Sequence, residues 1–356
     1  MGPGKVMAAM SGGVDSSVAA MLLLKSGYEV AGATLDLMPC QLEDNPDRCC
    51  GWSAIEDARR VAAQLNIPHY VLNYKEKFDK QVIDYFCAEY LRGRTPNPCI
   101  VCNRRIKFGD LLRQAQSMGM DYLATGHYAR IQYDPQRQRY ILLRGLDQRK
   151  DQSYVLYSLT QEQLAHTLFP LGGFNKTQIR AMAGDLELVV AEKAESQEIC
   201  FVPDDDYASF VEDRFPGSTS PGPILNLQGE ILGQHRGIVH YTIGQRRGLR
   251  LAQGQPIYVV ALDPQRNAVI VGSNNDVFST GCTAIDLNWI AVEKLEQAME
   301  VEAQIRYTAK PVQAMISSNG DGSVQVEFKE AVRAITPGQA IVFYEGDMVI
   351  GGGTIN

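Results

Sequence analysis

The sequence of 356 residues predicts an α/β domain with a doubly wound parallel sheet, followed by a small central domain and a C-terminal all-β barrel. Three observations indicate this. Short apolar segments alternate with helical periodicity as far as residue 125. Residues 215–255 are rich in Gly and Pro, as in FPGSTSPGP. Beyond Ile257 apolar and polar residues alternate with the period of a strand. We expect domains at 1–205, 206–275 and 276–356.

The elements of the first domain follow one another as strand, loop and helix. We expect strands at residues 5–9, 28–35, 68–72 and 122–125, and helices at 17–25, 53–65, 77–91 and 108–118, with Ser53 as a helix N-cap. Residues 129–144 are typical of an inserted hairpin with a DPQRQ turn. Residues 151–183 are typical of helices that are interrupted at FPLGG. Further on, VEAQIRYT, VQVEF and AIVFYEG are predicted strands, and Val301, Ala303, Ile305 and Tyr307 should share one face.

Composition limits the classes of function. Hydrophobic residues make up 45% of the chain, which is enough for well-formed cores. The N-terminus lacks the apolar stretch of a signal peptide, and no window approaches about 18 consecutive apolar residues, so we expect a cytoplasmic protein without a membrane span. The net charge of −7 argues against bulk binding of nucleic acid. It does not exclude binding through a local basic patch such as Arg246, Arg247 and Arg250.

The chain has eight cysteines: Cys40, Cys49, Cys50, Cys87, Cys99, Cys102, Cys200 and Cys282. Without an export signal a framework of disulfides is not expected, and clustered cysteines in a reducing compartment are more often catalytic or metal-binding. The adjacent pair Cys49 and Cys50 leaves a redox or a metal role open.

The segment Ser11-Gly-Gly-Val-Asp-Ser-Ser17 follows the first strand and opens the first helix. Its glycines allow backbone amides to approach an anion, and the N-terminus of the helix adds a positive dipole. The Walker A pattern is absent. Asp15 would repel phosphate, so we expect it to act as a helix cap or through a bridging Mg²⁺. The alternative is an ordinary turn between strand and helix.

A second motif, Thr95-Pro-Asn-Pro-Cys-Ile-Val-Cys-Asn103, contains two prolines and a C-x-x-C pair. The prolines predict an extended, rigid segment just before a helix. A thiol at such an N-terminus should gain thiolate character, and the basic run Arg104, Arg105 and Lys107 should strengthen it. The alternative is half of a structural zinc site, although no second C-x-x-C or histidine cluster completes four ligands.

A third motif, Glu195-Ser-Gln-Glu-Ile-Cys200-Phe, has a polar approach to its cysteine. Cys200 is either a small buried apolar residue or a functional thiol.

These motifs carry a resemblance. SGGVDSS resembles the pyrophosphate-binding loop of the N-type ATP pyrophosphatases, the PP-loop enzymes with an adenine nucleotide hydrolase-like fold. Together with TPNPCIVCNRRIKF, ATGHYAR, GLDQRKDQSYVLY, SQEICF, HYTIGQRRGL and TPGQAIVFY, it resembles the bacterial tRNA-specific 2-thiouridylases, in the same order and over nearly the whole chain. The resemblance implies adenylation of a wobble uridine in tRNAs for Lys, Glu and Gln, followed by sulfur transfer.

The resemblance also implies roles for individual residues. Cys102 matches the nucleophile and Cys200 the cysteine that carries a persulfide. The implied ATP-binding residues are Ala9, Met10, Ser11, Gly12, Gly13, Val14, Asp15, Ser16, Leu35 and Gly126. The implied tRNA-binding residues are Asn97, Pro98, Cys99, His127, Lys150, Asp151, Gln152, Arg306, Tyr307 and Gln339. ATP with Mg²⁺ is the implied cofactor. The implied partners are tRNA and a sulfur donor protein, either a cysteine desulfurase or a relay protein.

Cys99 stands where some relatives carry Asp, and this departure opens a second scheme. A persulfide supplies the strong terminal nucleophile that an adenylated carbonyl needs, and a second cysteine can release the product and leave a disulfide. Three cysteines, Cys99, Cys102 and Cys200, could instead hold an iron–sulfur cluster. Two other classes of protein stay open: a PP-loop enzyme that amidates its substrate, and a non-catalytic tRNA-binding or metal-sensing protein.

Overall fold

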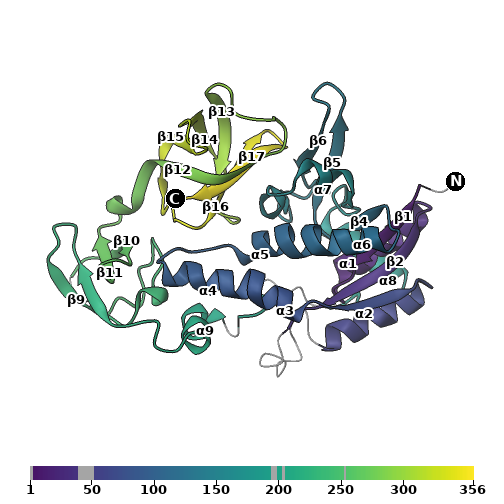
Figure 1. Cartoon of the computed structure of the whole chain (residues 1–356), viewed down its shortest axis with the longest axis horizontal. Helices are drawn as coiled ribbons and strands as arrows, with labels where there is room; N and C mark the ends of the chain where they lie inside the picture. The colour runs from purple at the N-terminus through teal and green to yellow at the C-terminus, as the bar shows by residue number, and fades with distance from the viewer. Residues whose placement is uncertain (1–2, 39–51, 194–198, 203–204, 252–253) are drawn as a thin grey trace.

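The computed structural model describes residues 3–38, 52–193, 199–202, 205–251 and 254–356. Cys40, Cys49, Cys50 and the polar residues 195–198 before Cys200 lie outside the described residues. Figure 1 shows the parallel sheet at one end of the long axis and the central strands at the other, with the C-terminal barrel beside both.

The first domain is the predicted doubly wound fold. In the described part of the chain, its parallel strands are ordered β3-β2-β1-β4-β7. Their bounds are β1 Lys5–Ala9, β2 Glu29–Asp36, β3 His69–Asn73, β4 Tyr122–Ala124 and β7 Thr167–Leu168. The chain runs outward from β1 to β3 and then crosses back to β4, so the order of strands reverses between β1 and β4. Loops that leave this switch point diverge and form the usual ligand crevice of such sheets.

Helices cover both faces of this sheet because β1 alternates its side chains between two apolar clusters. Val6 and Ala8 pack with helices α1 (Val14–Lys25), α2 (Trp52–Gln64) and α8 (Lys176–Asp185). Met7 packs on the opposite face with the helical segment that ends in α6 (Leu112–Ser117). The helix predicted from Ser53 begins at Trp52, so Ser53 lies inside it and the N-cap prediction is wrong.

One long helical segment differs from the prediction. It begins at α5 (Pro98–Val101), continues as a π-helical stretch (Cys102–Leu111) and ends with α6. We expected an extended chain through the prolines and a helix only from residue 108. The helix starts earlier because Asn97 caps it, accepting hydrogen bonds from the amides of Cys99 and Ile100, and because proline is favourable in the first turn.

The remaining elements of the first domain follow its predicted order. The helix expected at 77–91 is α3 (Lys75–Phe78), a π-helical stretch (Asp79–Ile83) and α4 (Asp84–Leu91). Residues 151–183 contain the 3-10 turn Ser153–Leu156, α7 (Gln161–Ala165) and the short strand β7, which the sequence did not indicate.

The inserted hairpin is confirmed as β5 (Ala129–Asp134) and β6 (Arg139–Arg144). It also pairs with the last strand of the chain, Leu143 opposite Met348. The hairpin therefore extends the sheet of the C-terminal barrel and ties this barrel to the first domain (Figure 1).

The C-terminal barrel is confirmed. Its strands are β12 Phe278–Trp289, β13 Met299–Gln304, β14 Val312–Ser318, β15 Val324–Arg333, β16 Ala340–Glu345 and β17 Met348–Ile355. Pairing of β12 with β17 closes the sheet. Val301, Ala303 and Ile305 are all buried. Tyr307 is 42% exposed because β13 ends at Gln304, so the prediction that it shares their face is wrong.

Between the two lies a small central part. After α9 (Tyr207–Arg214), strands β8 Gly222–Leu225, β9 Ile231–His235, β10 Tyr258–Asp263 and β11 Ala268–Gly272 form a separate sheet in the order β10-β11-β8-β9. Across the described residues, no helix has both the length and the apolar character needed to cross a membrane.

Candidate functional site

The loop at residues 10–13 joins β1 to α1 at the switch point of the sheet. Gly12 has a φ of +68°, and a Cβ there would lie 2.2 Å from the carbonyl oxygen of Ala54, so only glycine fits. Ser16 Oγ accepts a hydrogen bond from the amide of Ser11 at 3.1 Å and donates to the Gly13 carbonyl at 3.1 Å. The loop is thus folded back over the first turn of α1, as an anion-binding loop requires.

Strands β2 and β4 border this loop. The amide of Met10 donates to the Ala33 carbonyl at 2.8 Å, and Thr34 Oγ1 donates to the Met10 carbonyl at 2.7 Å. Leu35 follows in β2. Gly126 follows β4, and a Cβ there would lie 2.9 Å from the Ser16 amide. The residues implied as ATP ligands therefore lie together around the loop.

Asp15 is engaged by two side chains that the sequence did not point to. Its carboxylate accepts bonds from Lys176 Nζ at 2.7 and 2.8 Å and from the Tyr128 hydroxyl at 2.8 Å. The N-cap of α1 is Gly13, with no side-chain cap, so the prediction that Asp15 caps the helix is wrong. The carboxylate instead neutralises a lysine with a side chain only 12% exposed.

Cys102 lies at the start of the π-helical stretch and keeps only part of its surface accessible. Burial raises the pKa of its thiol to about 12, and the positive charge of Lys107 opposes this shift only in part. The predicted thiolate character at this helix start is therefore wrong for Cys102, because the thiol is packed within protein and does not face the solvated end of the helix.

The other two thiols lie close to Cys102. Negative charge on Cys200 or on Cys99 would raise the pKa of Cys102 further, so both lie within electrostatic reach of it. Cys102 and Cys200 also pack against one apolar cluster, which Leu35 joins from β2. Cys99 is exposed and Cys200 half-buried. Cysteines far apart in the sequence thus meet on the side of the sheet where the loop lies.

The described residues contain no group of three His, Cys, Asp or Glu side chains placed to hold a metal ion. Among the described residues, Cys99, Cys102 and Cys200 are thus not placed as a set of three ligands for an iron–sulfur cluster.

His127 connects the thiols to the nucleotide crevice. It follows Gly126, its Nδ1 lies 2.7 Å from Thr125 Oγ1, and its ring lies 5.9 Å from that of Phe108. Burial holds the pKa of His127 well below its usual range, and the charge of Lys107 lowers it further. His127 is therefore neutral at physiological pH. Lys107 acts on both His127 and Cys102, which shows that these groups share one electrostatic environment.

Several residues implied as tRNA contacts have internal partners. Asp151 is 9% exposed and pairs with Arg144 at 3.2 Å. Gln152 accepts a hydrogen bond from the Tyr128 amide at 3.0 Å. Gln339 donates to the Thr95 carbonyl at 2.9 Å and so joins the barrel to the segment before Cys99.

The other implied tRNA contacts differ in their exposure. Arg306 donates to the Arg333 carbonyl at 2.7 Å and is half-buried, whereas Tyr307 is exposed. Lys150 is half-buried and follows the exposed Arg149. Pro98 is buried in the first turn of α5, and Asn97 is occupied as its cap.

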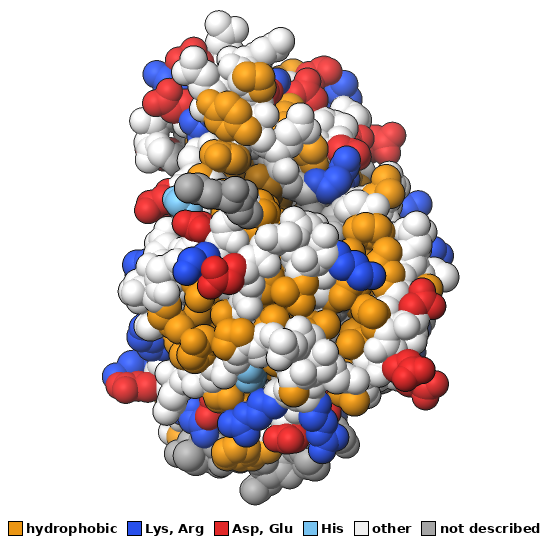
Figure 2. Space-filling view, turned by 90° about the vertical axis from the view of Figure 1, so that its right-hand side faces the viewer, with side chains coloured by type: hydrophobic (Ala, Val, Ile, Leu, Met, Phe, Trp, Pro, Cys, Tyr) orange, Lys and Arg blue, Asp and Glu red, His pale blue; other side chains and the backbone are white. Residues whose placement is uncertain are grey.

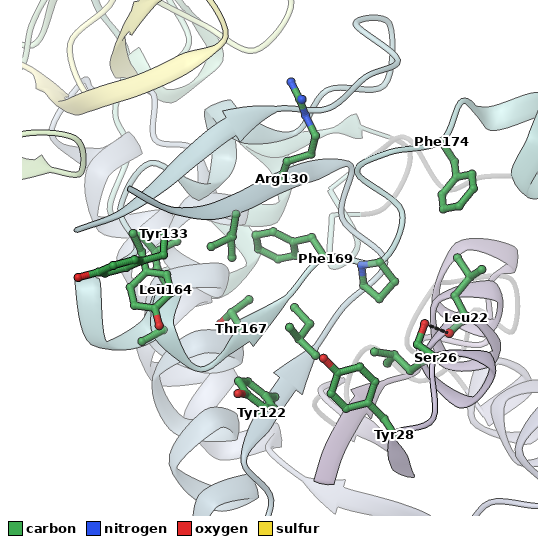
Figure 3. Close-up of a pocket in the computed structure, with 16 residues that line it drawn as sticks. Leu22, Ser26, Tyr28, Tyr122, Arg130, Tyr133, Leu164, Thr167, Phe169 and Phe174 are labelled. Atoms are coloured by element: carbon green, nitrogen blue, oxygen red, sulfur yellow. Dashed lines mark hydrogen bonds between the residues drawn. The ribbon is translucent and has the colours of Figure 1, made fainter. Parts of the chain in front are cut away.

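Figure 2 shows the face at the sheet end of the molecule, where apolar side chains gather in the middle and Lys and Arg are mixed with Asp and Glu. A pocket of about 560 Å³ lies near the end of α1 (Figure 3), where Tyr28, Tyr122 and Phe169 line it. No residue of the nucleotide loop contributes to this pocket, so it is separate from the site.

Comparison with known proteins gives a consistent result. Residues 4–204 match a family model described as the tRNA methyl transferase HUP domain, 208–273 the tRNA methyl transferase PRC-barrel domain, and 279–355 the aminomethyltransferase beta-barrel domain. The tRNA-specific 2-thiouridylase MnmA of Acetivibrio thermocellus is 54% identical over 354 residues, covering 99% of each chain. That of Moorella thermoacetica is 56% identical over 354 residues, covering 98% of each.

Among solved structures, a 4-thiouridine synthetase in an RNA complex with bound ATP aligns with a TM-score of 0.37 at 19% identity, covering 56% of this chain and 45% of that one. A similarity this low adds nothing to the assignment.

Proposed function

The chain belongs to the tRNA-specific 2-thiouridylase family, and we propose that it uses ATP to place sulfur on position 2 of the wobble uridine in tRNAs for Lys, Glu and Gln. The observation that carries this proposal is the continuity of the site. A glycine loop at the switch point of a parallel sheet is joined through Gly126, His127 and Lys107 to Cys102 and Cys200. This arrangement supports nucleotide activation and thiol chemistry at one site.

The first step activates the base. The carbonyl oxygen at position 2 is a poor leaving group, so it attacks the α-phosphate of ATP and releases pyrophosphate. The adenylated oxygen can then leave as AMP. The amides at the start of α1 suit the negative charge of the phosphates.

The second step transfers sulfur. A persulfide on Cys200 attacks the activated carbon with its terminal sulfur, and AMP leaves with the bonding electrons. The thiol of Cys102, which is protonated at neutral pH, then attacks Cys200 Sγ as its proton passes to the sulfur left on the base. The bond between Cys200 Sγ and that sulfur breaks, and a disulfide forms between the two cysteines. An external thiol must reduce this disulfide before the next cycle. The half-buried position of both thiols keeps water from competing for the activated base.

Mg²⁺ enters this scheme with ATP. Both oxygens of Asp15 already accept hydrogen bonds, from Lys176 and Tyr128, so Asp15 does not fit as a direct ligand of the metal. No iron–sulfur cluster is part of the proposal, because the three cysteines do not fit as its ligands.

The proposal includes the partners and the organisation of the chain. The persulfide must be supplied by a cysteine desulfurase or a relay protein, and the reaction takes place in the cytoplasm with its tRNA. We also propose that the domain boundaries lie near residues 205 and 275.

The experiment compares three cysteine variants in a reaction that contains ATP, tRNA and a persulfide donor. Cys102→Ser and Cys200→Ser should each abolish 2-thiouridine, whereas Cys200→Ser should still release pyrophosphate, because adenylation needs no thiol. Cys99→Ala should keep substantial activity. Loss of activity in Cys99→Ala, together with loss of stoichiometric iron from protein purified without oxygen, would contradict the persulfide route. Amidation that proceeds normally without Cys102 and Cys200 would favour an amidating PP-loop enzyme.

A further inference from the structure

The phosphate loop contains no cation of its own. The segment Ser11–Ser17 carries one charged side chain, Asp15, which is negative. Lys176 neutralises that carboxylate with bonds of 2.7 and 2.8 Å, and its side chain is only 12% exposed, so it presents little surface to a ligand. Pyrophosphate leaves with several negative charges, and backbone amides alone carry only partial charges to meet them. The chemistry calls for a further cation at the loop.

Lys193 occupies that position. Its Nζ donates to the carbonyl oxygen of Gly12 at 3.2 Å and to Asp57 Oδ2 at 2.7 Å. Gly12 is the residue at the apex of the loop, and Asp57 belongs to α2. The side chain of Lys193 is 37% exposed, so its ammonium group reaches the loop and still faces solvent.

The geometry of the ammonium group leaves room for a ligand. An ammonium has three N–H donors, and the two bonds above account for two of them. The third donor can meet a phosphate oxygen while Gly12 and Asp57 hold the nitrogen in place. Asp57 is thus a positioning residue, and its partial exposure of 25% leaves the pair accessible from the crevice.

We propose that Lys193 is a further residue of the ATP site, which binds the β- and γ-phosphates and stabilises pyrophosphate as it departs. No bond to Lys193 forms or breaks: the bond between the α- and β-phosphates of ATP breaks, and its electrons leave on pyrophosphate. The inference rests on the proposed cleavage of ATP to AMP and pyrophosphate.

The test measures the binding of ATP, AMP and inorganic pyrophosphate to the full chain by equilibrium dialysis. In Lys193→Ala, the affinities for ATP and pyrophosphate should fall roughly ten- to hundred-fold, the loss expected for a hydrogen bond between charged groups. The affinity for AMP should stay within about twofold, because AMP lacks both outer phosphates. Lys5→Ala is the matched control: it removes the same charge at the opposite end of β1, where Lys5 pairs with the exposed Glu29.

The outcomes distinguish the proposed role of Lys193 from the proposed function of the chain. If Lys193→Ala loses as much affinity for AMP as it loses for ATP, Lys193 only holds the loop together and the inference is overturned. Unchanged binding of ATP and pyrophosphate would overturn it as well. If the unmodified chain produces ADP, the proposed function itself fails. If it produces AMP and pyrophosphate while Lys193→Ala does so at the same rate and affinity, only the role of Lys193 is wrong.

Discussion

Replacing Asp151 with Asn should reduce the stability of the fold and leave tRNA affinity nearly unchanged. The resemblance implies that Asp151 contacts tRNA, but its side chain is only 7% exposed. One oxygen accepts from the amides of Gly145 and Ser153 at 2.9 and 3.0 Å. The other accepts from Ser153 Oγ at 2.8 Å and Arg144 at 3.2 Å. The carboxylate therefore has its hydrogen-bonding capacity filled by the protein.

The expected loss of stability depends on which hydrogen bonds of Asp151 an Asn side chain can keep. Its carbonyl oxygen can keep both bonds from the amides, but the charge that pairs with Arg144 is lost. A hydrogen bond between charged groups contributes about 1.5–3 kcal/mol, and a buried charge left unpaired raises the cost toward about 3–5 kcal/mol. The Arg144 guanidinium also lies 3.6 Å from the centre of the Tyr344 ring, which keeps part of its stabilisation. We expect a loss of about 2–4 kcal/mol.

The assay compares urea unfolding and tRNA binding of the same variant. Asp151→Asn should unfold at a lower urea concentration, and its folded fraction should bind tRNA within about twofold of the original chain. Arg149→Ala is the control, since Arg149 is 91% exposed and should change stability by less than about 0.5 kcal/mol. Unchanged unfolding of Asp151→Asn with tRNA affinity at least about tenfold weaker would refute this reasoning and support a direct contact.

Three further results are expected. Gly12→Ala should abolish ATP binding in equilibrium dialysis, because its Cβ would lie 2.2 Å from a carbonyl oxygen; retained binding would contradict the loop geometry. The alkylation rate of Cys102, followed by peptide mass spectrometry, should rise about tenfold per pH unit from neutral pH upward, because burial raises its pKa to about 12 and thiolate forms only as pH approaches that value. A plateau below about pH 9 would be inconsistent with that pKa. Reversing the charges of Arg246 and Arg247 should weaken tRNA binding. The slope of the logarithm of the binding constant against the logarithm of the salt concentration should become shallower by about one unit for each phosphate that is no longer bound. An affinity that does not change with salt would exclude tRNA binding through this basic patch.

The local parts of the fold and site could be predicted from the sequence. Strand β1 and the start of α1 follow from short-range patterns, because a short apolar run and a glycine loop are encoded by neighbouring residues. The barrel follows from period-two alternation in β13 and β15. Tyr307 was misplaced because the end of a strand depends on pairing and not on pattern alone.

The features of the site that the sequence did not predict depend on contacts between residues far apart in the chain. Lys176 reaches Asp15 across 161 positions, and Lys193 reaches Gly12 across 181 positions, so no local pattern signals either one. The protonation state of Cys102 was misjudged for the same reason. Its helix position is local, whereas the burial that decides its pKa comes from residues packed around it in the fold.

The most direct test of the central claim is nucleoside analysis of tRNA after incubation with the purified chain, ATP, Mg²⁺ and a persulfide donor. Mass spectrometry of the digested tRNA should show 2-thiouridine only when ATP is present, with one AMP and one pyrophosphate formed for each sulfur transferred. Omission of ATP, or replacement of wobble-uridine tRNA by one without uridine at that position, should remove the product. Formation of ADP as the main nucleotide, or the absence of 2-thiouridine under these conditions, would contradict the account.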